Sequence, residues 1–183
     1  MRALILRAQP SARARVQAVA LHHARPEIRL GLARQGAPGG ESLGREWPLD
    51  GRPARGLREA IAEFSPDLIH SHGPHHLTVS ANELTAGRIR VIHDVAEGPR
   101  DGDDLERRAV EESDALVVPS QALLEEFASR YTLPPLTCVF PSYPLARELP
   151  GDDGRESAEA NIDRIASLYE RLVREPMVGI VSG

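Results

Sequence analysis

The chain has 183 residues, a formal net charge of −5 and 41% hydrophobic residues, and all 22 of its basic side chains are arginines. This length fits one domain that buries roughly 70% of the surface of its unfolded chain. The acidic balance and the lack of a long basic run argue against a nucleic-acid partner, and the lack of lysine excludes Schiff-base and P-loop lysine chemistry.

Cys138 is the single cysteine, so the chain cannot form an internal disulfide. We expect it to be a buried strand residue. The first residues, M-R-A-L-I-L-R, form an apolar run too short for a signal peptide or a transmembrane segment, and no other such segment is visible. These features favour a reducing, cytoplasmic location.

Short apolar runs alternate with helix-like segments along the chain. The predicted strands are residues 2–7, 27–33, 67–72, 89–95, 115–119 and 137–140. The predicted helices are residues 11–23, 53–64, 75–85 and 103–113, a helix that begins after Ser120, and a last helix over 155–175. This alternation predicts an α/β fold with a mostly parallel sheet of about six strands and helices on both faces.

The segment P-G-D-D-G, at residues 150–154, is predicted to be a linker. It separates the α/β unit of residues 1–149 from one amphipathic helix. The helix carries a stripe of side chains on one face: Ala158, Ile162, Ile165, Tyr169 and Leu172.

Three of the predicted strands end in polar side chains that could take part in chemistry. These side chains are His70, Ser71 and His72; His93, Asp94 and Glu97; and Ser120. Ligands of open α/β sheets bind outside the carboxyl ends of the strands. The sequence therefore predicts a site at this edge of the sheet.

His70 and His72 point to the same face of their strand, because side chains alternate along a strand. Two imidazoles on one face could hold a metal ion, and His93 with Asp94 could complete a mononuclear hydrolase site. Such sites need further ligands on later strands, which the sequence does not offer, so no metal ligand is assigned. In the alternative interpretation, His70 packs under a helix and His72 sits at the rim.

The segment after Gly73-Pro74 begins with His75 and His76, which could hydrogen-bond a hydroxylated or anionic ligand at a helix start. His93, next to Asp94, has two equally good interpretations. It could be an oriented base or sugar-contacting group, or the pair could be a capped strand end in which Asp94 bonds loop amides.

Ser120 lacks the flanking glycines of a nucleophile elbow, and we expect it to be an N-cap with room for a ligand contact. The acidic stretch from Glu97 to Glu112 is typical of a solvated helix face, with Glu97 alone close enough to the strand end to face a cleft. The other acidic residues considered there are Asp101, Asp103, Asp104, Glu106 and Glu111.

The motifs P-D-L-I-H-S-H-G, V-I-H-D-V, E-E-S-D-A-L-V-V-P-S and C-V-F-P-S-Y, in this order, resemble the N-terminal half of retaining GT-B glycosyltransferases of the glycosyltransferase 4-like class. That class includes the glycogen-synthase-like and mannosyltransferase-like enzymes. The resemblance covers about Arg2 to Tyr143. It implies a Rossmann-like domain that binds the sugar or glycoconjugate acceptor, with the C-terminal helix packing back on it.

By this resemblance, His93 matches the strand-end histidine that faces the transferred sugar, and it is the expected catalytic residue. The resemblance and the strand-end positions together imply a substrate-binding set: His72, His75, Asp94, Glu97 and Ser120. Two features depart from the class. The loop after the first strand reads R-A-Q-P-S-A-R, without glycine, and the second Rossmann domain, which would hold the nucleotide-sugar, is missing from the sequence.

The sequence therefore leaves three hypotheses. In the first, the chain is a glycosyltransferase acceptor-side domain that transfers sugar only with a separate donor-binding chain, so that this chain itself binds no cofactor. In the second, it is a non-catalytic glycan- or protein-binding remnant, and one version of this hypothesis is a homodimer. In the third, it is a metal-dependent hydrolase that uses His70, His72 and His93.

Overall fold

The computed structural model describes residues 1–7, 12–35, 45–49, 51–72, 74–100, 102–140 and 153–174. The strands in these ranges are β1 (Arg2–Arg7), β2 (Arg29–Arg34), β3 (Glu46–Pro48), β4 (Leu68–His72), β5 (Arg90–Asp94), β6 (Ala115–Val118) and β7 (Leu136–Val139). The helices are α1 (Ala12–Ala24), α2 (Pro53–Phe64), α3 (His75–Thr85), α4 (Asp104–Glu111), α5 (Gln121–Ala128) and α6 (Asp153–Arg174).

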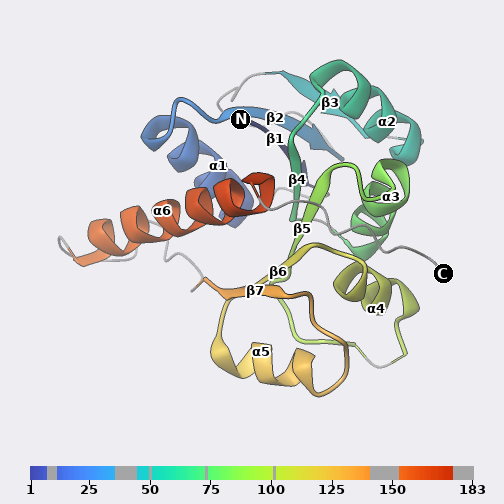
Figure 1. Cartoon of the computed structure of the whole chain (residues 1–183), viewed down its shortest axis with the longest axis vertical. Helices are drawn as coiled ribbons and strands as arrows, with labels where there is room; N and C mark the ends of the chain where they lie inside the picture. Colours follow the sequence, from blue (N-terminus) through green and yellow to red (C-terminus); the bar gives the residue numbers. More distant parts are fainter. Residues whose placement is uncertain are drawn as a thin grey trace.

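The strands form one sheet in the order β3-β2-β1-β4-β5-β6-β7, and every neighbouring pair is parallel (Figure 1). From β1 the chain builds outward to β2 and β3, and from β4 it builds outward in the opposite direction. The order therefore reverses between β1 and β4. In doubly wound sheets the ligand crevice lies at the carboxyl ends of the strands at such a reversal. The predicted α/β fold with a parallel sheet is confirmed.

The two faces of the sheet have separate apolar cores because side chains alternate along each strand. On one face, Ala3 and Leu68 pack with residues of α1 and α6. On the other, Leu4 and Ile69 pack with residues of α2 and α3. Figure 1 shows α1 and α6 on one side of the sheet and α2, α3 and α4 on the other. Since both faces are covered, the central strands read as nearly continuous apolar runs.

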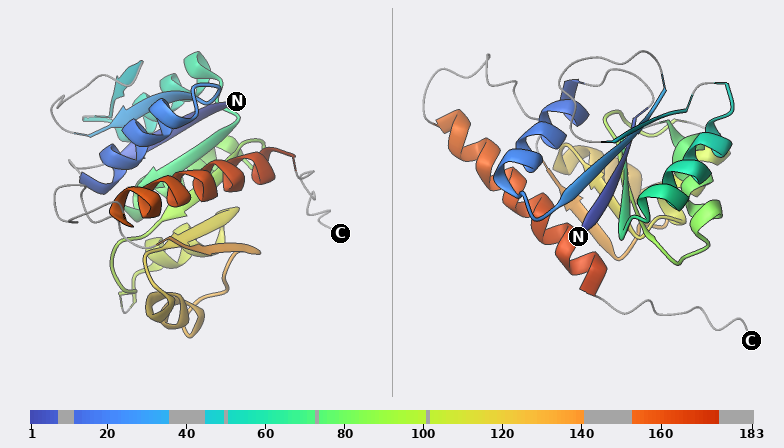
Figure 2. Two further views of the ribbon diagram at one scale, coloured as in Figure 1. Left: turned by 90° about the vertical axis from the view of Figure 1, so that its left-hand side faces the viewer. Right: turned by 90° about the horizontal axis from the view of Figure 1, so that it is seen from above.

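Helix α6 lies across the α1 face of the sheet, as the two views of Figure 2 show. Four residues of its predicted stripe are buried: Ile162, Ile165, Tyr169 and Leu172. On its exposed side, Asp163 pairs with Arg25 of the α1–β2 loop at 3.0 Å. Residues 150–152 of the expected linker lie outside the described residues. Among the helices that are described, none is both long enough and apolar enough to cross a bilayer.

Two details of the sheet differ from the sequence prediction. The segment Glu46–Pro48 forms a seventh, parallel strand at one edge. Three residues ending in proline give too short a pattern to be read as a strand. Cys138 does lie in a strand, but it is only partly buried, because β7 is the opposite edge strand and is covered less completely.

Candidate functional site

The carboxyl edge of the sheet carries a row of polar residues at the reversal point. Arg7, the last residue of β1, is in register with Arg34 of β2 on one side and with His72 of β4 on the other. Residues in register on parallel strands point to the same face, so all three belong to the face covered by α1 and α6. Both arginines are buried, and Nε of Arg34 donates to Oε2 of Glu46 at 2.8 Å.

The sequence analysis missed these two arginines, although each ends an apolar strand in the same way as His72. The signal was available, because a buried strand that ends in a charged residue places that charge at the ligand-binding edge. The row thus brings positive charge to an edge where only histidines and carboxylates were expected.

His70, His72 and Asp94 meet on the α6 face and are here called the aspartate–histidine cluster. Oδ2 of Asp94 lies 3.2 Å from Nδ1 of His72 and 3.5 Å from Nε2 of His70. The two imidazole rings are stacked, with centroids 4.1 Å apart. All three side chains are at most 5% exposed. His70 and His72 therefore share one face, as predicted, and the bond from His70 Nδ1 to the Tyr169 hydroxyl, 2.7 Å long, places His70 under α6.

His93 lies on the opposite face, although it precedes Asp94 in the chain. It is in register with Ser71 of β4 and is 1% exposed. Its Nδ1 lies 2.9 Å from Oγ1 of Thr78, and its Nε2 lies 3.2 Å from Nδ1 of His75. The set of His70, His72 and His93, on which the hydrolase hypothesis depends, is therefore not formed. Asp94 occupies the place beside the two histidines of β4 that the hydrolase hypothesis gave to His93.

The contacts of His93 continue into a chain of polar side chains, here called the histidine relay, which runs Thr78, His93, His75 and Glu106. Nε2 of His75 lies 3.2 Å from Oε1 of Glu106. An ionised carboxylate only accepts hydrogen bonds, so this nitrogen must carry a proton. The Thr78 hydroxyl lies 2.9 Å from Oγ of Ser71, to which it donates, and its oxygen lies 2.9 Å from Nδ1 of His93. Glu106 therefore orients the ring of His75, and Thr78 orients the ring of His93.

Burial keeps the rings of the relay neutral. It lowers the pKa of His93 to about 3, with a further contribution from the charge of His75. Burial also lowers the pKa of His75, although the charge of Glu106 acts in the opposite direction. At the far end, burial and the bond to Glu106 raise the pKa of Tyr131 to about 12. The relay therefore holds two neutral imidazoles, of which His75, 19% exposed, is the more accessible.

The acidic stretch was predicted to be a solvated helix face, and this prediction is wrong for Glu106, whose side chain is only 2% exposed. It accepts hydrogen bonds from the Tyr131 hydroxyl at 2.7 Å and from the Arg100 amide at 2.6 Å. Its own amide donates to Oδ1 of Asp103, the N-cap of α4. An acidic residue three positions after an N-cap is the spacing of a capping box, and that signal could have set Glu106 apart from its neighbours.

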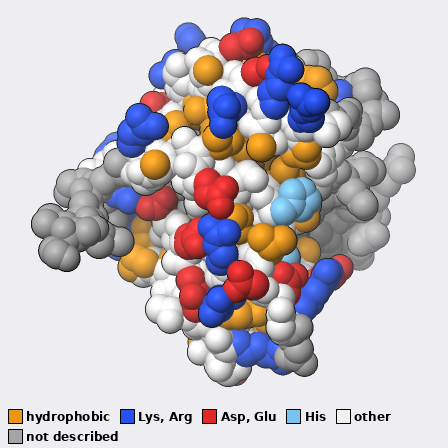
Figure 3. Space-filling view, turned by 90° about the vertical axis from the view of Figure 1, so that its right-hand side faces the viewer, with side chains coloured by type: hydrophobic (Ala, Val, Ile, Leu, Met, Phe, Trp, Pro, Cys, Tyr) orange, Lys and Arg blue, Asp and Glu red, His pale blue; other side chains and the backbone are white. Residues whose placement is uncertain are grey.

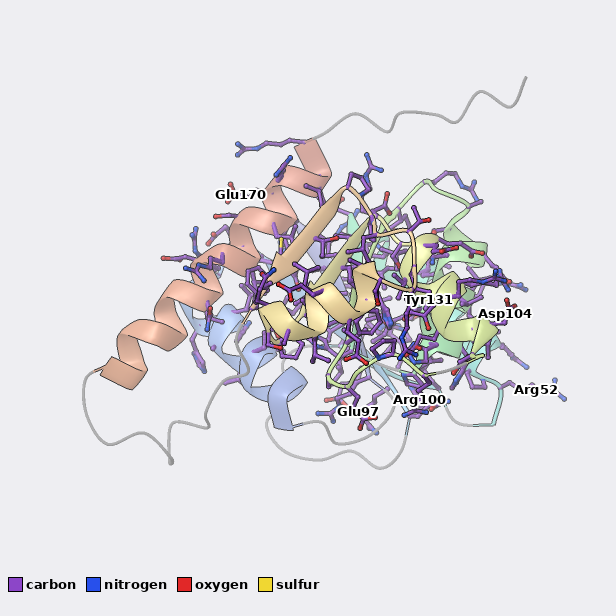
Figure 4. The ribbon with its side chains drawn as sticks, turned by 90° about the horizontal axis from the view of Figure 1, so that it is seen from below. Arg52, Glu97, Arg100, Asp104, Tyr131 and Glu170 are labelled. Atoms are coloured by element: carbon purple, nitrogen blue, oxygen red, sulfur yellow. The ribbon has the colours of Figure 1, made fainter. Side chains whose placement is uncertain are left out.

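The remaining predicted residues lie further from the two clusters. The side chain of Glu97 is 78% exposed and pairs with Arg100 at 3.0 Å (Figure 4). Ser120 is the N-cap of α5, where its hydroxyl accepts from the Leu123 amide at 3.2 Å, as predicted. The structure does not bring either residue into contact with His72 or His93 within the described residues.

The surface near the relay is charged and partly hollowed. A hollow of about 330 Å³ adjoins Tyr131, and Figure 4 shows Tyr131 close to Asp104 and Arg100. Its lining residues are Gly102, Asp103, Asp104, Arg107 and Tyr131. On the face shown in Figure 3, acidic and basic side chains are interspersed. Such mixed charge is typical of a solvated surface and does not indicate a binding site on this face. The candidate site is therefore placed at the carboxyl edge of the sheet, where the polar groups are buried.

Comparisons with known proteins agree with this architecture. The sequence model of Glycosyltransferase Family 4 matches residues 4–146. A search of curated proteins gives no match. Among solved structures, a sucrose-phosphate synthase chain from Thermosynechococcus elongatus superposes with a TM-score of 0.61 at 18% identity, over 92% of this chain and 98% of that chain.

Two further structures are similar over one part of their length. UDP-GlcNAc 2-epimerase from Neisseria meningitidis, bound to UDP-GlcNAc, has a TM-score of 0.58 at 15% identity, over 94% of this chain and 53% of the epimerase. HepE from Anabaena, in complex with UDP, has a TM-score of 0.57 at 14% identity, over 78% of this chain and 44% of HepE. This chain thus spans about half the length of either protein.

At such low identities the structural likeness shows the fold alone, which is that of one Rossmann-like half of a GT-B protein. The family follows from the sequence model, because its match covers most of the chain. The chain belongs to Glycosyltransferase Family 4.

Proposed function

We propose that this chain is the acceptor-side domain of a cytoplasmic glycosyltransferase, which transfers a sugar from a nucleotide-sugar only together with a separate donor-binding chain. The observation that carries the proposal is that this chain matches only about half of the length of GT-B proteins that were solved with a nucleotide bound. The chain accounts for 98% of a sucrose-phosphate synthase chain, but for only 53% and 44% of two proteins that were solved with UDP-GlcNAc and UDP. The single cysteine supports a reducing, cytoplasmic location.

Sugar transfer needs the departing diphosphate to be stabilised by charges or hydrogen-bond donors that are already in place. In a two-domain GT-B enzyme two Rossmann-like halves face each other across a cleft, and this chain supplies one of them. The separate chain would provide the nucleotide pocket. Arg7, at the carboxyl edge of this half, would contribute positive charge to the shared cleft, whereas the charge of Arg34 is balanced by Glu46.

On the acceptor side, we assign direct contacts to His72 and His75. Asp94 lies beside the ring of His72, with its Oδ2 3.2 Å from Nδ1 of that ring. His93 is 1% exposed, and both of its nitrogens contact other side chains. We therefore propose that His93 positions the ring of His75. Glu97, which is exposed, and the hydroxyl of Ser120 would contact outer parts of the acceptor.

A thermal-unfolding screen of the purified chain tests this proposal, because a ligand that binds only the folded state raises the midpoint of unfolding. The ligands are nucleoside diphosphates, nucleotide-sugars and a panel of mono- and oligosaccharide acceptors. We expect stabilisation by an acceptor and none by the nucleotides. At a hundredfold excess over Kd the gain is about 2.7 kcal/mol, or several degrees for a chain of this size.

His75→Ala should abolish the acceptor shift, whereas His76→Ala, at the exposed neighbouring position, should keep it. Stabilisation by a nucleotide-sugar would overturn the need for a separate donor chain. No shift with any sugar, together with dimers in solution, would instead support the non-catalytic binding hypothesis.

A further inference from the structure

We propose that His70, His72 and Asp94 form a binding site for a divalent transition-metal ion of the zinc class. Within the described residues, these three side chains can each offer one ligand atom, and the three atoms lie within 4.8 Å of one another. Two imidazole nitrogens and one carboxylate oxygen are a set that Zn²⁺ and Co²⁺ accept. The sequence predicts His70 and His72 on one face of their strand and offers His93 and Asp94 to complete a site; only Asp94 lies on that face.

Two of the three spacings between the ligand atoms agree with four-coordinate geometry. Zinc bonds to nitrogen and oxygen are about 2.05 Å long, so two ligand atoms of a tetrahedral site lie about 3.3 Å apart. Oδ2 of Asp94 lies 3.2 Å from Nδ1 of His72 and 3.5 Å from Nε2 of His70. The site therefore needs no movement of β4 against β5, which are hydrogen-bonded neighbours in register.

Tyr169 supplies the outer contact that a metal-bound histidine requires. Its hydroxyl lies 2.7 Å from Nδ1 of His70, and its oxygen can accept a hydrogen bond from Nδ1–H. The ring then presents the lone pair of Nε2, which is the atom that faces Asp94. Outer partners of this kind fix the tautomer and orientation of metal-bound histidines. Tyr169 is itself fully buried in α6, so it holds the first ligand rigidly.

His72 is the ligand that must move. Its ring is stacked on that of His70, with an angle of 28° between the planes. A metal ion lies in the plane of each imidazole that binds it, so the His72 ring must rotate out of the stack. His72 is the last residue of β4, so this rotation would take place at the carboxyl edge of the sheet, where the fourth coordination position would lie.

The metal site does not depend on the proposed glycosyltransferase function, and it can be tested without any sugar. Tag-free protein is stripped with a chelator and titrated with Co²⁺, whose visible absorption distinguishes four-coordinate from hydrated ion, and the bound Co²⁺ is then displaced by Zn²⁺. We expect one equivalent of four-coordinate Co²⁺. Asp94→Asn and His72→Ala should each abolish the signal, and both changes avoid the fully buried ring of His70.

Two further variants separate this site from others. Tyr169→Phe should weaken Co²⁺ binding about 10- to 100-fold, because it removes only the outer contact. The double variant His22→Ala/His23→Ala removes an exposed pair of adjacent histidines, whose ring centroids are 5.6 Å apart, and should still bind one equivalent. The proposal is overturned by an absence of four-coordinate Co²⁺, or by binding that survives Asp94→Asn and is lost in the double variant. In that case His70, His72 and Asp94 are a buried polar cluster that holds no metal ion.

Discussion

Nδ1 of His70 lies 2.7 Å from the hydroxyl of Tyr169, although 99 residues separate them in the chain. Both side chains are completely buried, one in the middle of the central strand β4 and the other in the C-terminal helix. The contact joins the helix to the same strand that carries the two histidines of the aspartate–histidine cluster. Helix α6 therefore takes part in building the site as well as in covering the sheet.

Replacing Tyr169 with phenylalanine tests the strength of this link in metal-free protein. The change removes the hydroxyl and keeps the ring, so the imidazole of His70 loses this partner inside the core. We expect the free energy of unfolding to fall by about 1–3 kcal/mol, measured by urea denaturation. Val173→Ala is the control, because Val173 is in the same helix but 42% exposed. Equal losses in the two variants would show that the hydrogen bond contributes nothing specific.

Gly56 permits α2 to pack closely against the segment that contains the short edge strand β3. A Cβ atom at this position would lie 2.6 Å from the backbone oxygen of Pro48, which cannot move independently of its strand. We expect Gly56→Ala to lower the free energy of unfolding by about 1–3 kcal/mol, in spite of the better helix propensity of alanine. At Gly98 the closest atom is the carboxylate end of Glu126, at 3.1 Å, which can turn away. Gly98→Ala should therefore stay within about 0.5 kcal/mol of the parent chain, and similar losses at both positions would refute the explanation.

Ser120 has a structural role that can be separated from any contact with a ligand. Its hydroxyl caps α5 by accepting from the Leu123 amide. Ser120→Ala should cost about 1 kcal/mol of stability, whereas Ser120→Asp, which retains a capping oxygen, should cost little. Thermal unfolding of the two variants measures this. If the aspartate variant is as unstable as the alanine variant, the cap is not the reason for the serine.

The elements with strong local signals were predictable from the sequence. Helix α3 occupies the predicted residues His75–Thr85, because Pro74 precedes its first turn and the left-handed residues Ala86 and Gly87 end it. The N-cap at Ser120 was read in the same way. Strand β3 was missed because a three-residue edge strand has no periodicity of its own, and it forms only by pairing with β2.

The sequence predicts the position of the site at the carboxyl edge of the sheet, but not which side chains contact one another there. His93 and Asp94 were treated as one unit because they are adjacent in the chain, yet alternation along β5 sends them to opposite faces of the sheet. Asp94 instead lies beside His70 and His72 of the neighbouring strand β4. The contact of His70 with Tyr169 depends on a helix from the far end of the chain, so no local pattern could give it. The capping-box spacing marks Glu106, but its bond with Tyr131 also depends on a segment distant in the chain.

The histidine relay predicts an acid-sensitive folded state through His75, whose pKa is lowered in the folded chain, mainly by burial. The charged or titratable groups that face this ring are Glu106, Asp103, Arg100, His76 and His93. The unfolded chain binds a proton at His75 near pH 6.5, whereas the folded chain does so only at lower pH. Below pH 6.5 the unfolded state therefore binds more protons, and the free energy of unfolding falls as the pH falls, by at most about 1.4 kcal/mol per pH unit for this one group.

We expect His75→Gln to flatten that pH dependence between pH 6.5 and 5, because glutamine cannot titrate but can still form hydrogen bonds in the relay. Urea denaturation at a series of pH values measures the slope. His22→Gln is the control, since His22 is exposed and meets solvent in both the folded and the unfolded state. A slope that stays the same in His75→Gln would show that the acid sensitivity arises elsewhere, and that His75 is not held neutral by its burial beside the sheet.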